Sequence, residues 1–329
     1  MFIGHALLAF ALAALIAQWR GLSSQQALAL GLVAGAFAAL PDVDVLYAAV
    51  AANPTELVAS TGVQPEAFWG PANEAHRLMT HSLVVAALAG PAFALWTLRS
   101  ATGWRRGGAV LGAGVLAGLV VVAAEASGLI GAFVVGAFVL VGIGIAELSQ
   151  SRLDLSPGLL ALAATAGIAS HPWGDLVTGE PPALFYPFEV SLLSERIVLS
   201  SDPTLHLLGA FALELAVVAL AAVVVAREAG YRPHRLVDRR ALIGAVYGVT
   251  AVFMAPPTIH LSYQFVGSIL AVGGVCGIGH PSVRGWYPVR TAIDRLAGTS
   301  KRALRTVLTT LAAIAIALLS YGVVYLLVG

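Results

Sequence analysis

The sequence predicts an all-α membrane protein, a polytopic transmembrane helical bundle of roughly ten helices with two longer outer loops. Hydrophobic residues make up 59% of the 329 residues and charged residues only 11%, and the mean hydropathy is +0.88. A water-soluble domain of this length is less apolar, because its surface must contact water. Apolar stretches of about 20 residues, the length that crosses a bilayer, recur between Pro, Gly and short charged clusters.

The expected spans begin near Phe2, Gln25, Ser82, Gly107, Gly128, Pro157, Thr204, Ala241, Leu261 and Arg305. We interpret the first as a helix and not as a signal peptide, because it lacks a basic start and Arg20 follows its apolar run. Glycines at three- and four-residue spacing, as in 107–118 and 267–279, favour close helix packing in lipid. The polar, Pro- and Gly-rich stretches 47–80 and 171–203 are the two longer outer loops.

The positions of the basic residues predict how the chain threads through the membrane. When the spans alternate across the bilayer, all of the 18 Lys and Arg except Arg77 and Arg196 fall on one side. The positive-inside rule assigns that side to the cytoplasm, so we expect a multi-pass protein of the plasma or inner membrane with both termini non-cytoplasmic. The basic segments lie next to membrane lipid, and we expect no nucleic acid partner.

A Pro-Asp-x-Asp motif ends the second span on the outer side. Its carboxylates, Asp42 and Asp44, are costly at a membrane boundary and should therefore have partners. Pro41 lacks an N–H and disrupts the helical turn. We expect locally extended chain here, which would turn both carboxylates the same way and suit them to bridging a metal.

The second motif, His76-Arg77-Leu78-Met79-Thr80-His81-Ser82, immediately precedes the third span. Two imidazoles five residues apart do not share one face of a continuous helix. They converge if Thr80 caps a helix that begins at His81, so we expect a loop-to-helix junction. Arg77 is one of the two outward basic residues, and a guanidinium beside a metal suits a phosphate or carboxylate.

The third motif, His171-Pro172-Trp173-Gly174-Asp175, ends the sixth span. In a continuous helix His171 and Asp175 would point the same way, and Pro172 and Gly174 weaken that geometry. Alternatively, Pro172 opens a new helical turn and Asp175 is reached through a loop. His5 lies at the outer end of the first span and completes the set.

Together these motifs place seven potential ligands at one membrane face: His5, Asp42, Asp44, His76, His81, His171 and Asp175. Mixed imidazole and carboxylate ligation suits zinc, with manganese or iron as alternatives, and seven ligands exceed the needs of one tetrahedral ion. We expect two divalent ions that activate water for hydrolysis. The same groups could instead translocate protons or metal ions, or hold a structural metal in a non-catalytic protein.

Other residues carry weaker signals. His206 and His260 also fall near the outer face, but neither has a neighbouring carboxylate motif. Ser82 follows His81, yet no G-x-S-x-G elbow surrounds it, which argues against a serine hydrolase. Glu125 and Glu214 lie within spans and are interpreted as interhelical hydrogen-bonding groups. The single cysteine, Cys276, excludes an intrachain disulfide.

These motifs, in this order, resemble the membrane-bound metal-dependent hydrolases, also described as LexA-binding, inner-membrane-associated hydrolases. The resemblance rests on His5, the Pro-Asp-x-Asp run, the His-Arg-x-x-Thr-His-Ser run and the His-x-x-x-Asp run, followed by Leu184-Phe185-Tyr186-Pro187-Phe188. It implies metal-dependent hydrolysis, with a likeness to zinc-dependent phospholipase C enzymes and hence a phospholipid or other phosphoester substrate. Where the family usually has a helical His-Leu-Leu-Leu-Asp, this chain has Pro172 and Gly174.

The resemblance covers about the first two hundred residues. We therefore expect a metal-site-bearing domain over residues 1–203 and accessory transmembrane helices over 204–329. In the hydrolase hypothesis the seven ligands hold the ions, Asp44 also assists the chemistry and Arg77 steadies an anionic phosphoester or lipid-linked substrate at the non-cytoplasmic face.

The threading can be tested by labelling single cysteines introduced at Ser60 and Arg235 with a membrane-impermeant reagent in intact cells. We expect label at position 60 and none at position 235, because only the former loop faces outward. Label at 235 without label at 60 would overturn the orientation.

Overall fold

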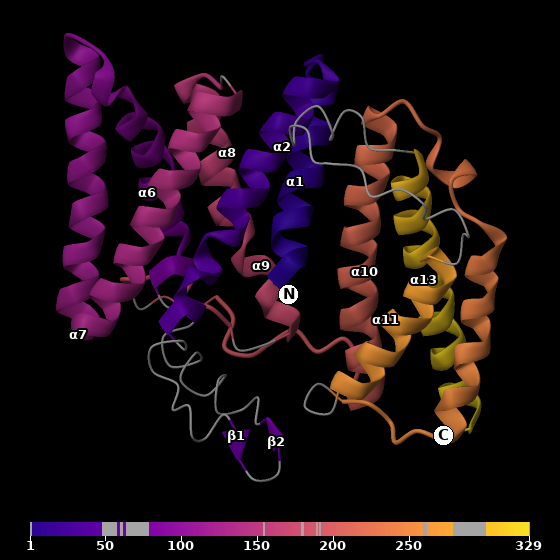
Figure 1. Ribbon diagram of the computed structural model, residues 1–329. Helices are drawn as coiled ribbons and strands as arrows, with labels where there is room; N and C mark the ends of the chain where they lie inside the picture. The colour runs from indigo at the N-terminus through magenta and orange to yellow at the C-terminus, as the bar shows by residue number, and fades with distance from the viewer. Residues whose placement is uncertain are drawn as a thin grey trace. The chain divides into compact units, whose positions relative to one another are not determined.

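The computed structural model describes residues 2–47, 58–59, 62–63, 79–153, 155–178, 181–188, 190, 192–258, 262–278 and 301–328. Several residues of the predictions lie outside this part of the chain, namely Ser60, His76, Arg77, Leu78, His260 and Leu261. Contacts divide the chain into two compact units, unit 1 (Met1–Arg196) and unit 2 (Ile197–Gly329), which are described separately. Helices dominate the described residues, so the predicted all-α fold is confirmed (Figure 1).

Unit 1 is a bundle of helices that lie side by side. Its elements, with η for a 3₁₀ helix, are α1 (Phe2–Trp19), α2 (Ser24–Ala39), η1 (Pro41–Val45), β1 (Val58–Ala59), β2 (Gly62–Val63), η2 (Met79–His81), α6 (Leu83–Trp96), η3 (Thr97–Ser100), α7 (Trp104–Leu153), α8 (Pro157–Ser170) and α9 (Pro172–Thr178). Packing partners follow the order α1, α2, α8, α6, α7 (Figure 1). Helix α8 thus lies between α2 and α6, although it follows both in sequence.

Helix α7 comprises the fourth and fifth expected spans. Its 50 residues would be about 75 Å long if straight, far more than a bilayer core of about 30 Å. The backbone leaves helical geometry at Ser127 and at Gly128, whose φ of 62° favours glycine. Gly112 before the break and Gly142 after it both pack against the C-terminal part of α6, so the chain reverses there. The division expected near Gly128 is confirmed.

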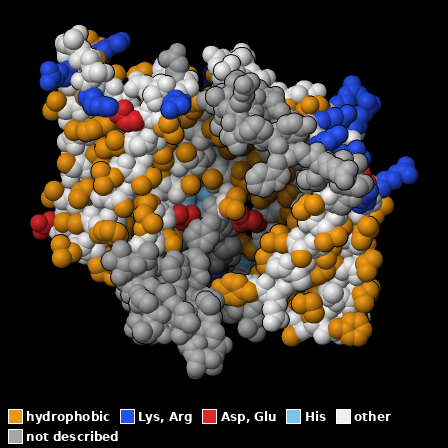
Figure 2. Space-filling view, in the orientation of Figure 1, with side chains coloured by type: hydrophobic (Ala, Val, Ile, Leu, Met, Phe, Trp, Pro, Cys, Tyr) orange, Lys and Arg blue, Asp and Glu red, His pale blue; other side chains and the backbone are white. Residues whose placement is uncertain are grey.

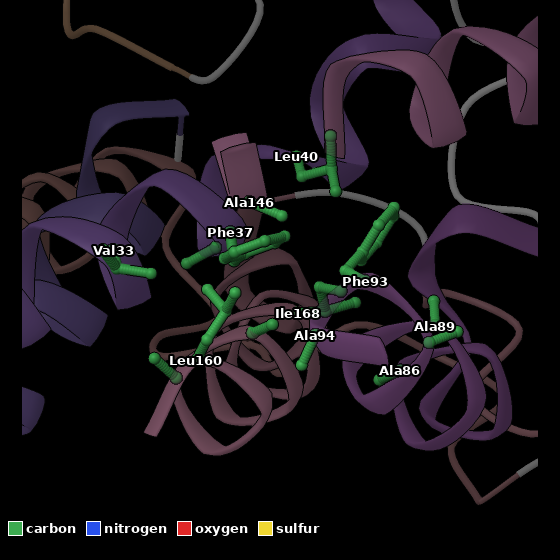
Figure 3. Packing of buried hydrophobic residues seen from close by; sticks show 14 of the residues in the cluster. Val33, Phe37, Leu40, Ala86, Ala89, Phe93, Ala94, Ala146, Leu160 and Ile168 are labelled. Atoms are coloured by element: carbon green, nitrogen blue, oxygen red, sulfur yellow. The ribbon is translucent and has the colours of Figure 1, made fainter. Parts of the chain in front are cut away.

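Aromatic and small side chains fill the core of unit 1. The ring of Phe93 from α6 lies 5.5 Å from that of Phe37 in α2 and 5.9 Å from that of Phe138 in α7, centroid to centroid. Leu160 and Ile168 from α8 join them (Figure 3). Glycines allow the backbones to approach, as small residues do in membrane bundles.

Unit 2 contains α10 (Pro203–Glu228), η4 (Pro233–Arg235), η5 (Arg239–Val252), α11 (Tyr263–Ile278) and α13 (Lys301–Val328). The span expected near Ala241 is a 3₁₀ helix, in which every third residue faces the same way. Ala241, Gly244 and Tyr247 are accordingly buried, and Gly244 lies against the backbone of Ala313 in α13. Tyr247 also packs with the rings of Phe265 and Tyr321.

A carboxylate joins two elements at the basic end of unit 2. A hydrogen bond from the backbone N–H of Arg240 and an ion pair with Arg305 hold the pKa of Asp238 below its usual value. The 2.6 Å contact with Arg305 links the start of η5 to the first turns of α13. Figure 2 shows Lys and Arg side chains gathered at one end of unit 2.

The helical lengths fit a membrane protein. Five segments of the described chain are long and apolar enough to cross a bilayer, namely Ser24–Val45, Leu83–Ser100, Trp104–Leu153, Pro203–Glu228 and Lys301–Val328. Shorter apolar helices, Ile3–Trp19 and Tyr263–Ile278, accompany them.

The basic residues that adjoin the long helices of unit 1 lie at one end of its bundle, namely Arg20, Arg99, Arg105, Arg106 and Arg152. Figure 2 shows Lys and Arg side chains at the upper left, over the start of α7. Arg99, in η3 directly after α6, forms an ion pair with Glu147 in the second half of α7. Along α1, His5 and Arg20 are separated by 15 residues, or about 22 Å of helix. The described residues of the His and Asp motifs therefore lie at the end of unit 1 opposite these five basic residues, while the side that faces the cytoplasm remains a prediction.

Close packing at Gly167 gives a stability prediction. A Cβ at position 167 would lie 2.9 Å from Cβ of Phe37 and 3.0 Å from the backbone N of Ala38, whereas one at Gly136 would meet nothing within 4 Å. We expect Gly167→Ala to destabilise unit 1 by about 1–3 kcal/mol through overpacking. Gly136→Ala, the matched control, should be neutral or stabilising because alanine favours helix. Melting in detergent measures both, and equal midpoints would contradict the packing.

Candidate functional site

The candidate ligands lie where helices of unit 1 are interrupted. Helix α2 gives way to η1 at Pro41, η2 gives way to α6 at Ser82, and α8 gives way to α9 at Pro172. Non-helical backbone at such depth is tolerated when it is buried in protein, and interrupted helices often form ion sites. The packing of α8 between α2 and α6 brings the three interruptions together.

The Pro-Asp-x-Asp motif forms a 3₁₀ turn, so the expected extended chain is wrong. Pro41 is the first residue of η1, where a missing N–H costs nothing. Each residue of a 3₁₀ helix turns about 120°, so side chains two apart diverge. Asp42 approaches His171, with Oδ1 3.4 Å from Nε2, while Asp44 approaches His81, with Oδ2 3.6 Å from Nδ1.

The loop-to-helix junction at His81 is present, but the expected cap is wrong. Ser82, not Thr80, caps α6, and its hydroxyl accepts hydrogen bonds from the backbone N–H groups of Val84 and Val85. A serine directly before an apolar run is a usual helix-start signal, and it could have identified this role. Thr80 lies in η2 and donates its hydroxyl to Asp44 Oδ2 over 3.1 Å.

At the third motif Pro172 opens a new helix, as the alternative predicted, but Asp175 lies within that helix and not in a loop, so the second half of that prediction is wrong. His171 keeps helical backbone angles as the C-cap of α8, and α9 carries Asp175. Gly174 has a steric role, because a Cβ there would lie 2.6 Å from Nδ1 of His5. The departure from the usual family pattern thus makes room for the His5 ring, whose Nε2 lies 3.3 Å from Asp175 Oδ1.

Six of the seven predicted ligands therefore gather in one cluster, which consists of His5, Asp42, Asp44, His81, His171 and Asp175. The seventh, His76, and the predicted catalytic residue Arg77 lie outside the described residues. Five members of the cluster are at most 4% exposed, and the Asp42 side chain is 14% exposed. Asp42 thus forms the accessible edge of an otherwise buried cluster.

Hydrogen bonding fixes the proton on His171. Its Nδ1 lies 2.6 Å from the carbonyl oxygen of Ala38, which can only accept, so Nδ1 carries the proton. In the neutral ring, Nε2 then carries no proton and presents a lone pair. That lone pair faces His81 Nε2 at 3.0 Å, Asp42 Oδ1 at 3.4 Å and Asp175 Oδ2 at 3.8 Å. The two carboxylates can only accept, whereas His81 Nε2 donates or accepts according to the tautomer of its ring, so either a proton on His81 Nε2 or a cation joins the two ring nitrogens.

The spacing of these atoms fits a metal ion. Two ligands of a tetrahedral zinc, each about 2.0–2.1 Å from the ion, lie about 3.3 Å apart. Asp175 Oδ2 is 3.3 Å from His81 Nε2, and the three distances from His171 Nε2 range from 3.0 to 3.8 Å. Burial of carboxylates is costly unless a positive charge compensates them, which also favours a divalent ion here.

Two overlapping groups of potential ligands lie in the cluster: His5, His171 and Asp175, and Asp42, His81 and His171. Both groups contain His171, and Nε2 offers a single lone pair, so His171 can serve one ion. Asp175 could bridge, because Oδ1 faces His5 and Oδ2 faces His81. Asp44 belongs to neither group. The expected pair of ions stays a prediction.

The Leu184–Phe188 segment, which follows the third motif, is hydrogen-bonded to the start of α6. Ser82 donates its hydroxyl to the carbonyl oxygen of Tyr186 over 2.8 Å, and Leu83 N–H donates to the carbonyl oxygen of Leu184 over 2.8 Å. The Leu184–Phe188 run therefore covers the beginning of α6, next to His81. His206, by contrast, belongs to unit 2, where its Nδ1 accepts a hydrogen bond from Leu199 N–H.

Fold and site define an α-helical integral membrane protein with a buried histidine and aspartate cluster at one end of its first unit. The chain belongs to the YdjM inner membrane protein family, whose model matches residues 1–256. The match extends past the predicted domain boundary at residue 203 into unit 2. Comparison with curated proteins and comparison with solved structures each gave no match.

The contact between Ser82 and the Leu184–Phe188 segment can be tested separately from helix capping. Ser82→Ala and Ser156→Ala each remove a serine N-cap, worth about 1 kcal/mol, but only Ser82 also bonds to Tyr186. We expect faster amide hydrogen exchange across residues 181–188 in Ser82→Ala than in Ser156→Ala. Equal exchange of that segment in the two variants would contradict a role for Ser82 in holding it.

Proposed function

We propose that this protein is a membrane-embedded metal-dependent hydrolase whose centre is the cluster at the end of unit 1. The approach of two imidazole Nε2 atoms to 3.0 Å, with carboxylate oxygens around them, carries the proposal. When His81, like His171, carries its proton on Nδ1, two Nε2 lone pairs face each other and repel at that distance, and a shared cation removes the repulsion. Because the cation would be buried among up to three carboxylates, a divalent ion balances charge better than a proton.

The residues of the cluster would have different roles in binding the ion and in transferring protons. His81, His171, Asp42 and Asp175 would hold the ion, and Asp175 would also orient His5 through its second oxygen. A divalent ion in such a site activates water and polarises the oxygen of a phosphoryl or carbonyl group. His5, at 3.3 Å from Asp175, is placed to accept or deliver a proton beside the reacting groups.

Asp42 indicates where a substrate would enter. It is the most exposed of the six potential ligands that the structure describes, and it lies at the end of the Ser24–Val45 span. A site there is reached from the membrane boundary, which supports a phosphoester or lipid-linked substrate presented at the lipid surface. Arg77, four residues before His81, would contact an anionic group of that substrate. We place this face on the non-cytoplasmic side, as the basic residues predict.

The near-complete burial of the other ligands favours a second candidate, a structural metal that ties the three helix interruptions together. Structural sites are closed, whereas catalytic sites keep an open position. The hydrolase and the structural site would both bind a metal ion, but only the hydrolase would turn over a substrate.

Metal content tests the centre. We expect purified protein to hold one to two equivalents of a divalent ion and His171→Ala to lose most of it, because Nε2 of His171 belongs to both ligand groups. His206→Ala is the matched control, since it removes another buried histidine that lies in unit 2. Elemental analysis after gel filtration measures the metal content per protein chain. Equal metal content in His171→Ala and His206→Ala would reject the proposed metal centre.

Turnover then separates the candidates. A chromogenic phosphodiester in detergent should be hydrolysed by the wild type and by His206→Ala, with activity falling at least about 100-fold in His171→Ala. Metal bound without hydrolysis of that diester or of phospholipid vesicles would favour the structural candidate. Ion flux in vesicles without hydrolysis would favour transport.

A further inference from the structure

Thr80 and Asp44 lie on the side of His81 that faces away from the proposed ion. The Thr80 hydroxyl oxygen lies 3.0 Å from His81 Nδ1 and 3.1 Å from Asp44 Oδ2. Asp44 Oδ2 also lies 3.6 Å from the same ring nitrogen. Nε2, on the opposite side of the ring, faces His171 and Asp175.

The directions of these hydrogen bonds follow from the groups present. A hydroxyl has one proton, and that of Thr80 is donated to the carboxylate of Asp44. The Thr80 oxygen can then only accept from His81, so Nδ1 of His81 must carry the proton. Nε2 is therefore the lone pair. His81 and His171 reach the same state by different means, because a backbone carbonyl of Ala38 fixes the latter.

Burial strengthens the hydrogen bonds that join Asp44, Thr80 and His81. Asp44 is 0% exposed, Thr80 1% and His81 1%, so water does not compete for the two hydrogen bonds. The 3₁₀ geometry of η1 directs Asp44 away from Asp42 and toward the back of the His81 ring. Asp44 is thus separated from the proposed ion by the imidazole itself.

We propose that Thr80 and Asp44 are positioning residues that hold His81 with Nδ1 protonated and Nε2 directed at the ion. The inference rests on the proposed metal centre and revises the predicted role of Asp44 from ligand to support. A partner that donates or accepts at the far nitrogen of a metal-bound histidine commonly changes metal affinity about 10- to 100-fold. The threonine is therefore part of the site although it touches neither metal nor substrate.

The test compares Thr80→Val with Thr80→Ser. Valine keeps the shape of threonine and lacks the hydroxyl, whereas serine keeps the hydroxyl. Full-length protein in detergent, stripped with a chelator, is titrated with Co²⁺ and followed by its visible absorption. We expect Co²⁺ binding about 10- to 100-fold weaker in Thr80→Val and within about 2-fold of the wild type in Thr80→Ser. A merely structural role would lower the melting temperature without this hydroxyl-dependent change in affinity.

Asp44→Asn adds a second arm, because asparagine keeps an acceptor and removes the charge. Weaker binding in both Asp44→Asn and Thr80→Val supports the positioning role. Weaker binding in Asp44→Asn alone, with Thr80→Val equal to the wild type, overturns it and makes Asp44 a ligand. If the wild type itself binds no Co²⁺, the proposed centre fails and this inference fails with it.

A spectroscopic measurement on the wild type keeps the inference falsifiable if Thr80→Val does not fold. Nitrogen chemical shifts of ¹⁵N-histidine-labelled, zinc-loaded protein report which ring nitrogen is protonated. Assignment uses the signal lost in His81→Gln. The inference predicts a protonated Nδ1 and a zinc-bound Nε2 for His81, and the reverse assignment would overturn it.

Discussion

The 3.0 Å approach of the Nε2 atoms of His81 and His171 is the contact on which the rest of the site depends. It exists because α8 packs between α2 and α6, with Gly167 against the backbone of α2. If both rings carry their proton on Nδ1, as proposed for His81, two Nε2 lone pairs face each other and need a cation between them. Helix packing, hydrogen-bond direction and charge balance therefore all converge on one position in unit 1.

Much of the fold was predictable from the sequence because few backbone conformations satisfy their hydrogen bonds in lipid. Apolar stretches of spanning length must be helices, and a helical segment of the described chain occupies each expected place. The reversal at Gly128 was predictable because 50 apolar residues cannot lie straight across one bilayer. The 3₁₀ form of η5 was not, because it depends on how Gly244 and Gly248 meet α13.

The cluster was predictable as a set, because ionisable side chains near lipid are costly and must find one another. The local geometry was not. Extended chain at Asp42 was reasonable from the missing N–H of Pro41, but the 3₁₀ turn and the contact of Asp44 with His81 depend on tertiary packing. The cap at Ser82 could be predicted from a serine before an apolar run, whereas its hydrogen bond to Tyr186 could not. Gly174 looked like a helix-weakening residue, and its steric role became visible only with His5 beside it.

Membership of the YdjM inner membrane protein family fits the membrane character of the chain, and the His and Asp cluster adds a chemical hypothesis to it. The most direct test of that hypothesis is an anomalous-scattering map from crystals of the wild type, recorded at the absorption edge of the metal that the purified protein carries. The account predicts a peak about 2.0–2.1 Å from Nε2 of both His81 and His171. A map with no peak between those two nitrogens, in crystals whose metal lies elsewhere, would contradict it.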